Sequence, residues 1–385
     1  MSYADIIKKK SKEWHSENMM SQAMVVKNRK LPFSSPLINY ATYGGIPRGM
    51  ITEFFGDPGG GKSSSAIDIC KNAVMIFKAE HEQKLAELHD KVTSGDKQAK
   101  ILLEDLHDIG PKRVLYIDLE HSMDGAWVKK LGVDNKDIDI MQPPDVPAEE
   151  LLQMVQELIE SGELGLVVLD SIPSLTTRQE IEKKFGERTV ASLAGLLTVF
   201  CRKIIPILTR YDTTLLVINQ VRDNLDNPYV TNTPGGKALK FYCSLRIQFK
   251  IGSPVDFIGN ELPSNAENPS GYIINAKIVK QKSAPWDRRN ASYYLMSQSG
   301  IRTDMDIAQL AVKKYGLISK AAAWFSFTDP ESGEILEDES GKPIKVNGMA
   351  KVYEFLMEHQ EYYNKLSRYI IHDIETSTQE VEQDV

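Results

Sequence analysis

The sequence predicts an α/β fold with a mostly parallel central sheet. Apolar runs of strand length alternate with helix-length segments, and the runs are 50–55, 113–119, 164–170 and 213–220. Continuous apolar runs are typical of strands buried on both faces, and strand–helix alternation is typical of a parallel sheet. From residue 241 the pattern changes to longer strand candidates separated by turns, which are 241–251, 271–282 and 291–297. These predict a meander that extends the sheet.

The remaining segments predict an arm, an insertion, a small domain and a tail. Residues 1–36 contain an amphipathic helix and an extended piece, and residues 37–301 form the core. Residues 76–112 are interpreted as an insertion of two charged helices, broken at Ser94-Gly95-Asp96. Residues 302–372 predict a small α+β domain. The last stretch, 373–385, holds five acidic residues and no basic one, which is typical of a disordered tail.

Composition excludes several classes of protein. The chain has 385 residues, of which 42% are hydrophobic and 26% are charged, as in ordinary globular proteins. We expect no membrane span and no signal peptide, because no sufficiently long apolar run is evident. The three cysteines are scattered, which favours a reducing cytoplasm. The net charge of −7 means that any DNA contact must come from a local patch or from backbone amides.

A phosphate-binding loop follows the first apolar run. The segment fits G-x-x-x-x-G-K-[ST] and consists of Gly56, Asp57, Pro58, Gly59, Gly60, Gly61, Lys62 and Ser63. Its glycines allow successive backbone N–H groups to surround a polyphosphate, and the helix that follows points its N-terminus at the same charge. We expect Lys62 to neutralise phosphate charge and Ser63 to hold Mg²⁺. A glycine-rich turn with a chance lysine is the alternative.

The other three runs also end in residues suited to phosphate chemistry, at the edge where ligands bind to parallel sheets. Asp170 closes one run and suits a Mg²⁺ carboxylate. Glu120 suits the base that orients the attacking water, and Gln220 suits a γ-phosphate sensor. A simple strand-end capping role is as plausible for any one of them, but not for all together. The sequence therefore predicts an ATPase.

Six segments then resemble motifs of the RecA family of DNA recombinases, in the same order from about residue 37 to about residue 327. They are 116–124, 167–171, 216–222, 235–242, 277–282 and 317–325. GGKALKFY (235–242) and the Lys-x-Lys pair of KIVKQK (277–282) are not general to phosphate-loop proteins. The chain is therefore identified as a member of this family, with ATP and Mg²⁺ as cofactors and a RecA-type core.

The resemblance implies roles at the ATP site. The residues implied in ATP chemistry are Lys62, Ser63, Ser64, Glu120 and Asp170. Asp124 and Trp127 occupy the positions that hold adenine, although a tryptophan is more often a core residue. Lys280 and Lys282 would reach the neighbouring subunit's ATP across a filament interface. Without the family, both lysines would be read as solvent-facing charges on a strand.

The resemblance also implies two DNA-binding loops. The first is 182–189, followed by Val190, Thr198 and Arg202; without the family this segment is more simply a solvated charged face. The second is 221–234, in which Arg222 could contact phosphate and Tyr229 or Val230 could wedge between bases. Gly235 and Gly236 would offer backbone N–H groups to DNA phosphates, with Lys237 beside them. The expected partners are single-stranded DNA, a homologous duplex, further copies of the chain in a helical filament, and single-strand-binding or mediator proteins.

Some features depart from the family pattern. The 76–112 insertion is absent from ordinary bacterial members. Gly195 stands where the family usually has a DNA-contacting arginine. We interpret the chain as a divergent member and hypothesise a phage or plasmid origin. Two other functions stay open: a ring-forming motor with the same core, and an accessory ATPase that binds single-stranded DNA without strand exchange.

Overall fold

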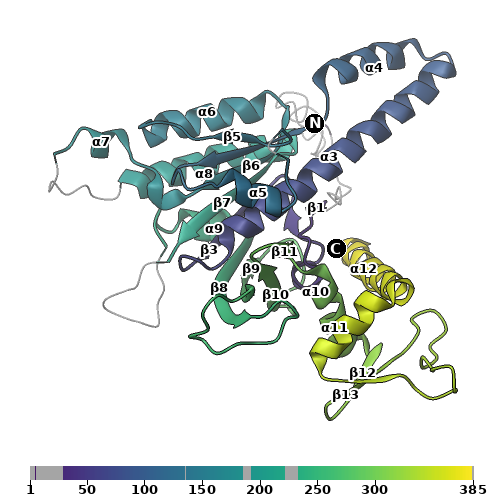
Figure 1. Cartoon of the computed structure of the whole chain (residues 1–385). Coiled ribbons are helices and arrows are strands. Elements are labelled where there is room, and N and C mark those ends of the chain that lie inside the picture. Colours follow the sequence, from purple (N-terminus) through teal and green to yellow (C-terminus); the bar gives the residue numbers. More distant parts are fainter. Residues whose placement is uncertain (1–4, 6–28, 135, 185–191, 222–232, 384–385) are drawn as a thin grey trace.

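The structure is a computed structural model that describes residue 5 and residues 29–134, 136–184, 192–221 and 233–383, with side chains to residue 377. It has a nine-stranded sheet in the order β11-β10-β9-β8-β3-β7-β6-β4-β5 (Figure 1). The strands are β3 (Ile51–Gly56), β4 (Arg113–Asp118), β5 (Asp139–Met141), β6 (Leu164–Asp170), β7 (Thr214–Gln220), β8 (Leu245–Val255), β9 (Gly271–Gln281), β10 (Asn290–Met296) and β11 (Gly300–Ile301). The predicted α/β fold with a mostly parallel sheet is confirmed.

The sheet combines a parallel half with an antiparallel extension. Strand β3 pairs in parallel with β7 on one side and β8 on the other, and β6, β4 and β5 continue the parallel half. Strands β8, β9, β10 and β11 form the predicted meander. A short pair, β1 (Lys30–Leu31) with β2 (Ile46–Pro47), precedes β3. The carboxyl ends of β3, β4, β6 and β7 therefore lie along one edge.

Helices cover both faces of the parallel half. One face packs against α3 (Lys62–Thr93) and α5 (Gly125–Lys130), and the other against α6 (Ala148–Glu160) and α8 (Ser192–Tyr211). Alternate strand residues serve the two layers: Val168 contributes to the α3 side, and Val167 and Leu169 to the α6 side. Burial on both faces explains why the strands read as continuous apolar runs.

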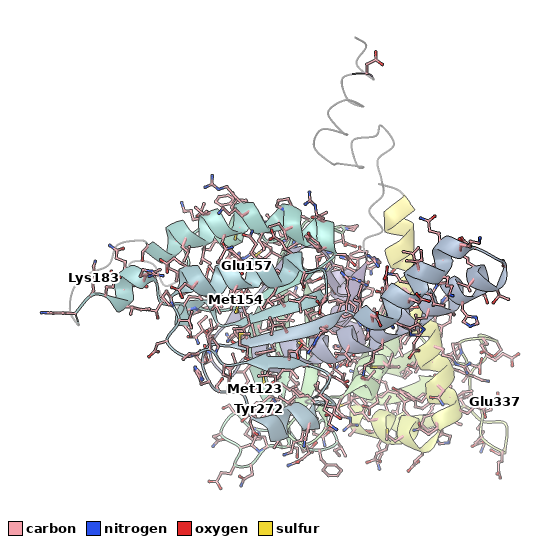
Figure 2. The ribbon with its side chains drawn as sticks, turned by 90° about the horizontal axis from the view of Figure 1, so that it is seen from above. Met123, Met154, Glu157, Lys183, Tyr272 and Glu337 are labelled. Atoms are coloured by element: carbon pink, nitrogen blue, oxygen red, sulfur yellow. The ribbon has the colours of Figure 1, made fainter. Side chains whose placement is uncertain are left out.

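Helix α6 shows how one stripe of a helix meets the sheet. Met154 is partly buried and packs against the core cluster, whereas Glu157 is exposed (Figure 2). The short elements η1 (Ile172–Ser174), α7 (Arg178–Ile181) and α9 (Ala238–Tyr242) follow the carboxyl edge of the sheet. Helix α7 directly precedes the first predicted DNA loop, and α9 follows the second.

The predicted insertion forms a helical hairpin that projects from the core (Figure 1). Its first helix is not separate, as the sequence had suggested, because α3 continues unbroken from the phosphate loop to Thr93. The predicted break at Ser94-Gly95-Asp96 is present, and Asp96 caps α4 (Lys97–Ile109) by accepting from the N–H groups of Gln98 and Ala99. The good helix formers between residues 76 and 93 explain the continuity.

Helix α8 corrects the expectation that no apolar run could cross a membrane. By length and composition alone, this helix could cross a membrane; the search covered the described residues. Its buried face, which includes Leu197, Cys201 and Ile204, packs against the sheet. Core packing therefore accounts for its apolar character.

The C-terminal part has its own hydrophobic cluster. Its elements are α10 (Thr303–Leu310), η2 (Ala311–Tyr315), β12 (Ile318–Ala321), β13 (Trp324–Phe327), β14 (Lys345–Asn347), α11 (Met349–Glu358) and α12 (Gln360–Gln383). A short helix, α2 (Pro36–Thr42), contacts α10 and β10. The module is thus α+β, with a three-stranded sheet in the order β12-β13-β14.

The predicted disordered tail is wrong for most of its length. Helix α12 continues through residue 373 to Gln383. Leu366, Ile370 and Ile374 recur four residues apart and are buried in the C-terminal cluster. This apolar stripe anchors the helix despite the acidic residues that share it. Apart from Asp5, the predicted N-terminal helix lies outside the described residues.

Candidate functional site

The phosphate loop joins β3 to α3 in a conformation that only glycine accommodates well. Gly56 has φ +149°, and a Cβ there would lie 2.0 Å from the carbonyl oxygen of Phe249 on β8. Gly61, with φ +83°, is the N-cap of α3. The chain can therefore turn tightly here, which is the loop conformation that lets backbone N–H groups face an anion.

Lys62 is folded back over the loop. Its ammonium group donates to the carbonyl oxygens of Gly56 (3.0 Å) and Asp57 (2.6 Å). The residue is buried, and burial lowers the pKa of the lysine, while the negative charges of Asp170 and Glu120 oppose that change. A phosphate group would replace neutral carbonyl partners with a charged one, so Lys62 lies where a polyphosphate is best stabilised.

Asp170 receives two hydroxyl groups at the end of β6. Ser63 donates to its Oδ2 at 2.7 Å, and Tyr116 donates to the same atom at 2.6 Å. Burial raises the pKa of Asp170, and the two donated hydrogen bonds oppose this rise. The Ser63 hydroxyl and the Asp170 carboxylate are adjacent hard oxygen donors, a pair that fits Mg²⁺ when phosphate and water oxygens complete the coordination.

Glu120 and Gln220 meet at the same edge although they are 100 residues apart. The Gln220 amide donates to Oε1 of Glu120 at 2.9 Å, and the Ser171 hydroxyl donates to the same oxygen. Gln220 ends β7, and the segment predicted as the second DNA loop follows directly. The geometry links an acidic side chain suited to orienting water with the start of that loop.

A cavity of about 360 Å³ lies between this edge and α5. Its lining includes Ser63, Asp124, Trp127 and Asp170. The indole N–H of Trp127 donates to the Ser64 hydroxyl at 3.2 Å, and the half-buried ring also packs against the core. The Asp124 carboxylate accepts from the N–H of Ala126 and caps α5. Both residues predicted to hold adenine thus line a cavity next to the phosphate loop, and both also have structural partners.

The Lys-x-Lys pair lies at the end of β9. Lys280 donates to the carbonyl oxygens of Lys240 (2.6 Å) and Phe241 (2.8 Å), and Lys282 donates to the same oxygen of Phe241 (3.2 Å). Burial and the neighbouring Lys282 charge lower the pKa of Lys280. Two ammonium groups therefore converge on one carbonyl at the C-terminal end of α9, where an additional anion would relieve their repulsion.

The predicted DNA residues are described only in part. Val190, Arg222 and Tyr229 lie outside the described residues. On α8, the Thr198 hydroxyl donates to the Ala194 carbonyl oxygen at 2.7 Å, and Arg202 is exposed.

The Gly-Gly-Lys segment that follows the second loop packs on α8. A Cβ at Gly235 would lie 2.6 Å from a Leu197 methyl group, and one at Gly236 would lie 2.8 Å from the Ala194 Cβ. Lys237 is exposed. Close packing on α8 is therefore a structural reason for both glycines, beside the DNA contact that was predicted.

Sequence analysis assigned no role to Tyr116 or to a buried network beneath Gln220. Asn219 donates to Oε1 of Glu53 (2.9 Å) and to the carbonyl oxygen of Pro234 (3.1 Å). Glu53 also forms an ion pair with Arg246, whose guanidinium lies 4.6 Å from the Phe55 ring centroid. Polar residues inside apolar strands are the signal that could have found this network, because such groups need partners.

Comparisons with known proteins agree with this arrangement. Residues 100–302 match the family model of the RecA N-terminal domain. The chain is 32% identical to Protein RecA of Thermus aquaticus over 326 residues, which are 84% of this chain and 78% of the relative. It is 27% identical to Protein RecA of Aquifex aeolicus over 343 residues, or 88% and 82% of the two chains. It is 30% identical to Protein RecA of Ruminococcus albus over 307 residues, or 79% and 66%.

Proposed function

The chain belongs to the RecA family of recombination proteins as a divergent member, and from this premise we propose that it forms filaments on single-stranded DNA and catalyses ATP-dependent homologous pairing and strand exchange. The single observation that carries the proposal is the convergence of Lys62, Asp170, Glu120 and Gln220 at one edge of the sheet. Gln220 joins this edge to the segment proposed to bind DNA. We also propose a cytoplasmic location, as expected for a recombination protein.

The ATP site would divide its work among five side chains. The N–H groups of the phosphate loop and Lys62 would bind the phosphates, and Trp127 would stack on the adenine. Ser63 and Asp170 would hold Mg²⁺, which when bound neutralises charge on the phosphate oxygens. Glu120 would orient the attacking water and accept its proton.

Gln220 would couple the nucleotide to DNA. In the ligand-free structure its amide donates to Glu120. A γ-phosphate carries more negative charge than the Glu120 carboxylate, so the amide would turn toward it and leave Glu120 free to hold water. Because Gln220 directly precedes the proposed second DNA loop, that movement would change the loop and, reciprocally, DNA on the loop would favour hydrolysis.

The DNA interface is proposed to be local, since the net charge is −7. Arg222, Lys237 and Arg202 would meet phosphates, and Tyr229 and Val190 would contact bases. Lys280 and Lys282 would leave their carbonyl partners for the ATP of the next subunit. That contact would make hydrolysis depend on filament formation.

The test is the ATP hydrolysis rate with and without single-stranded DNA, with Lys62→Ala as control. Strong stimulation that Lys62→Ala abolishes supports the proposal, and a strand-exchange assay with a homologous duplex completes the test. Retained turnover in Lys62→Ala would refute the assignment of the phosphate loop.

Two other outcomes would redirect the assignment. DNA-stimulated hydrolysis without strand exchange would favour an accessory ATPase. A closed ring that unwinds forks would favour a motor. The intact Glu120–Gln220 contact and the Lys-x-Lys pair support the recombinase over both.

A further inference from the structure

A second cavity lies at the opposite edge of the sheet, where the inserted hairpin leaves the core. Its volume is about 360 Å³. We call it the basal cavity, and its cationic lining residues are Arg29, Arg48, Lys84, Lys112 and Arg210. Lys112 precedes β4 and Asp212 precedes β7, so the cavity borders the amino ends of the parallel strands. It is therefore a different place from the ATP site, which lies at their carboxyl ends.

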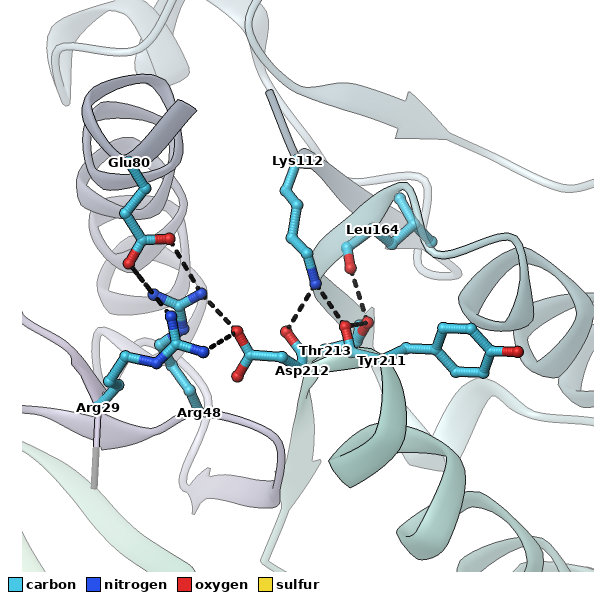
Figure 3. Close-up of polar contacts among 8 residues, drawn as sticks. All are labelled: Arg29, Arg48, Glu80, Lys112, Leu164, Tyr211, Asp212 and Thr213. Carbon is cyan, nitrogen blue, oxygen red and sulfur yellow. Dashed lines mark hydrogen bonds and ion pairs between the residues drawn. The ribbon is translucent and has the colours of Figure 1, made fainter. Parts of the chain in front are cut away.

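Two acidic residues in the basal cavity are already neutralised by two arginines. Arg48 donates to both carboxylate oxygens of Glu80, at 2.5 and 3.2 Å, and to Asp212 at 2.7 Å. Arg29 donates to the same oxygen of Asp212 at 2.6 Å. Figure 3 shows this cluster, with Glu80 contributed by α3 and Asp212 by the turn before β7. The two carboxylates are thus paired with the two arginines and, in the part of the chain that the structure describes, form no ion pair with the other cations of the cavity.

The remaining cations have no acidic partner among the described residues. Lys112 donates to the main-chain carbonyl oxygens of Tyr211 and Asp212, the latter at 3.2 Å (Figure 3). Neither Lys84 nor Arg210 forms a hydrogen bond or ion pair within the described part of the chain. Lys112 therefore satisfies its hydrogen bonds with neutral atoms, and the positive charge around it is not balanced.

Arg48 adds a buried donor without a partner. Its side chain is 3% exposed, and its Nε has no hydrogen-bond partner in the described structure. A buried N–H group of this kind costs free energy unless a ligand or water accepts from it. Its presence in the lining distinguishes this cavity from a group of surface lysines.

The electrostatic environment of Lys112 also indicates unbalanced positive charge in the basal cavity. Burial lowers the pKa of Lys112, Asp212 is the acidic residue that opposes this change, and the positive charges of Arg48, Lys84 and Arg29 lower it further. Mutual repulsion among these cations is relieved when an anion enters. The lining of the cavity therefore carries more positive than negative side chains.

We propose that the basal cavity is a second ligand site, which binds a small, multiply charged anion of the phosphate class such as pyrophosphate or another polyphosphate. Donors surround the cavity on α3, α8 and the strand-entry turns, so they match a ligand with several acceptor oxygens better than a single carboxylate. The inserted helix α4 supplies an apolar wall through Leu106 and Ile109. The site therefore depends on the insertion and does not rest on the proposed strand exchange.

The test uses the full chain with its phosphate loop saturated by Mg²⁺ and a fluorescent ADP analogue. Pyrophosphate is titrated in by calorimetry, and retained fluorescence shows that the ADP analogue stays bound. The test variant is Lys84→Ala with Arg210→Ala. The matched control is Lys91→Ala with Lys97→Ala, which removes two exposed lysines of the same hairpin that lie outside the cavity lining.

The expected result is saturable binding that is at least about tenfold weaker in the test variant and unchanged in the control, as the loss of two charge-assisted contacts implies. No saturable binding to the unsubstituted protein would overturn the proposal, and so would equal weakening in both variants. A short DNA duplex forms the second arm. If the duplex alone loses affinity in the test variant, while pyrophosphate does not bind, the cavity contacts a nucleic-acid backbone and the small-anion assignment is wrong.

Discussion

Replacing Glu53 by Gln should destabilise the protein strongly although the two side chains have nearly the same shape. Glu53 is fully buried, and its carboxylate pairs with Arg246, whose side chain is 11% exposed. Glutamine can still accept from Asn219 but carries no charge. The substitution therefore removes the ionic partner of a largely buried guanidinium while it preserves the hydrogen bond beneath Gln220.

The magnitude follows from the burial of the pair. Removing one partner of a buried ion pair costs about 3–5 kcal/mol, because the other charge stays desolvated. Arg246 keeps its contact with the Phe55 ring, at 4.6 Å, and contacts of that kind contribute about 0.5–2 kcal/mol. We therefore expect Glu53→Gln to lower the free energy of unfolding by about 3 kcal/mol, the lower end of that range.

The assay is urea unfolding at pH 7, followed by circular dichroism. Adding Arg246→Met to Glu53→Gln should recover at least about 1 kcal/mol, because the unpaired charge is removed. Asp139→Asn is the matched control: it breaks the exposed pair with Arg113, whose side chains are 58% and 43% exposed, and should cost at most about 1 kcal/mol. A cost for Glu53→Gln no greater than that of the control would refute the reasoning.

Three further predictions concern the ATP site, the filament and the C-terminal helix. Tyr116→Phe removes a hydrogen bond that lowers the pKa of Asp170, so that pKa should rise further and the acid limb of ATP hydrolysis should move to higher pH; a pH–rate profile with an unmoved limb would contradict this. Lys280→Ala with Lys282→Ala should leave nucleotide binding largely intact but remove DNA-dependent hydrolysis, and surviving stimulation would rule out the cross-subunit role. Ile370→Ala should lower the free energy of unfolding by about 2–5 kcal/mol, measured by chemical denaturation, because the side chain is fully buried. The control is Ile371→Ala, at an exposed position of the same helix. An equally large loss there would show that the experiment measures helix propensity and not packing.

The sequence by itself was enough to predict that the candidate site lies at the carboxyl ends of the parallel strands. The phosphate loop is local, since its glycines, Lys62 and Ser63 are neighbours in the chain. Asp170, Glu120 and Gln220 could be assigned because parallel strands bring their carboxyl ends to the same edge, so the strand pattern predicts their proximity. Short-range rules therefore sufficed for the core and for most of the proposed ATP site.

Only the tertiary structure decided which side chains meet across the sheet and where the helices end. Glu53 and Arg246 are 193 residues apart, and no local pattern pairs them. The acidic composition of residues 373–385 predicted disorder, but burial of Ile370 and Ile374 against distant residues extends α12. Likewise, the basal cavity exists because α3 and α4 bring Glu80 and Lys84 to turns that lie far away in the sequence. Burial and long-range pairing depend on packing between elements, and packing is not encoded in the composition or spacing of any single segment.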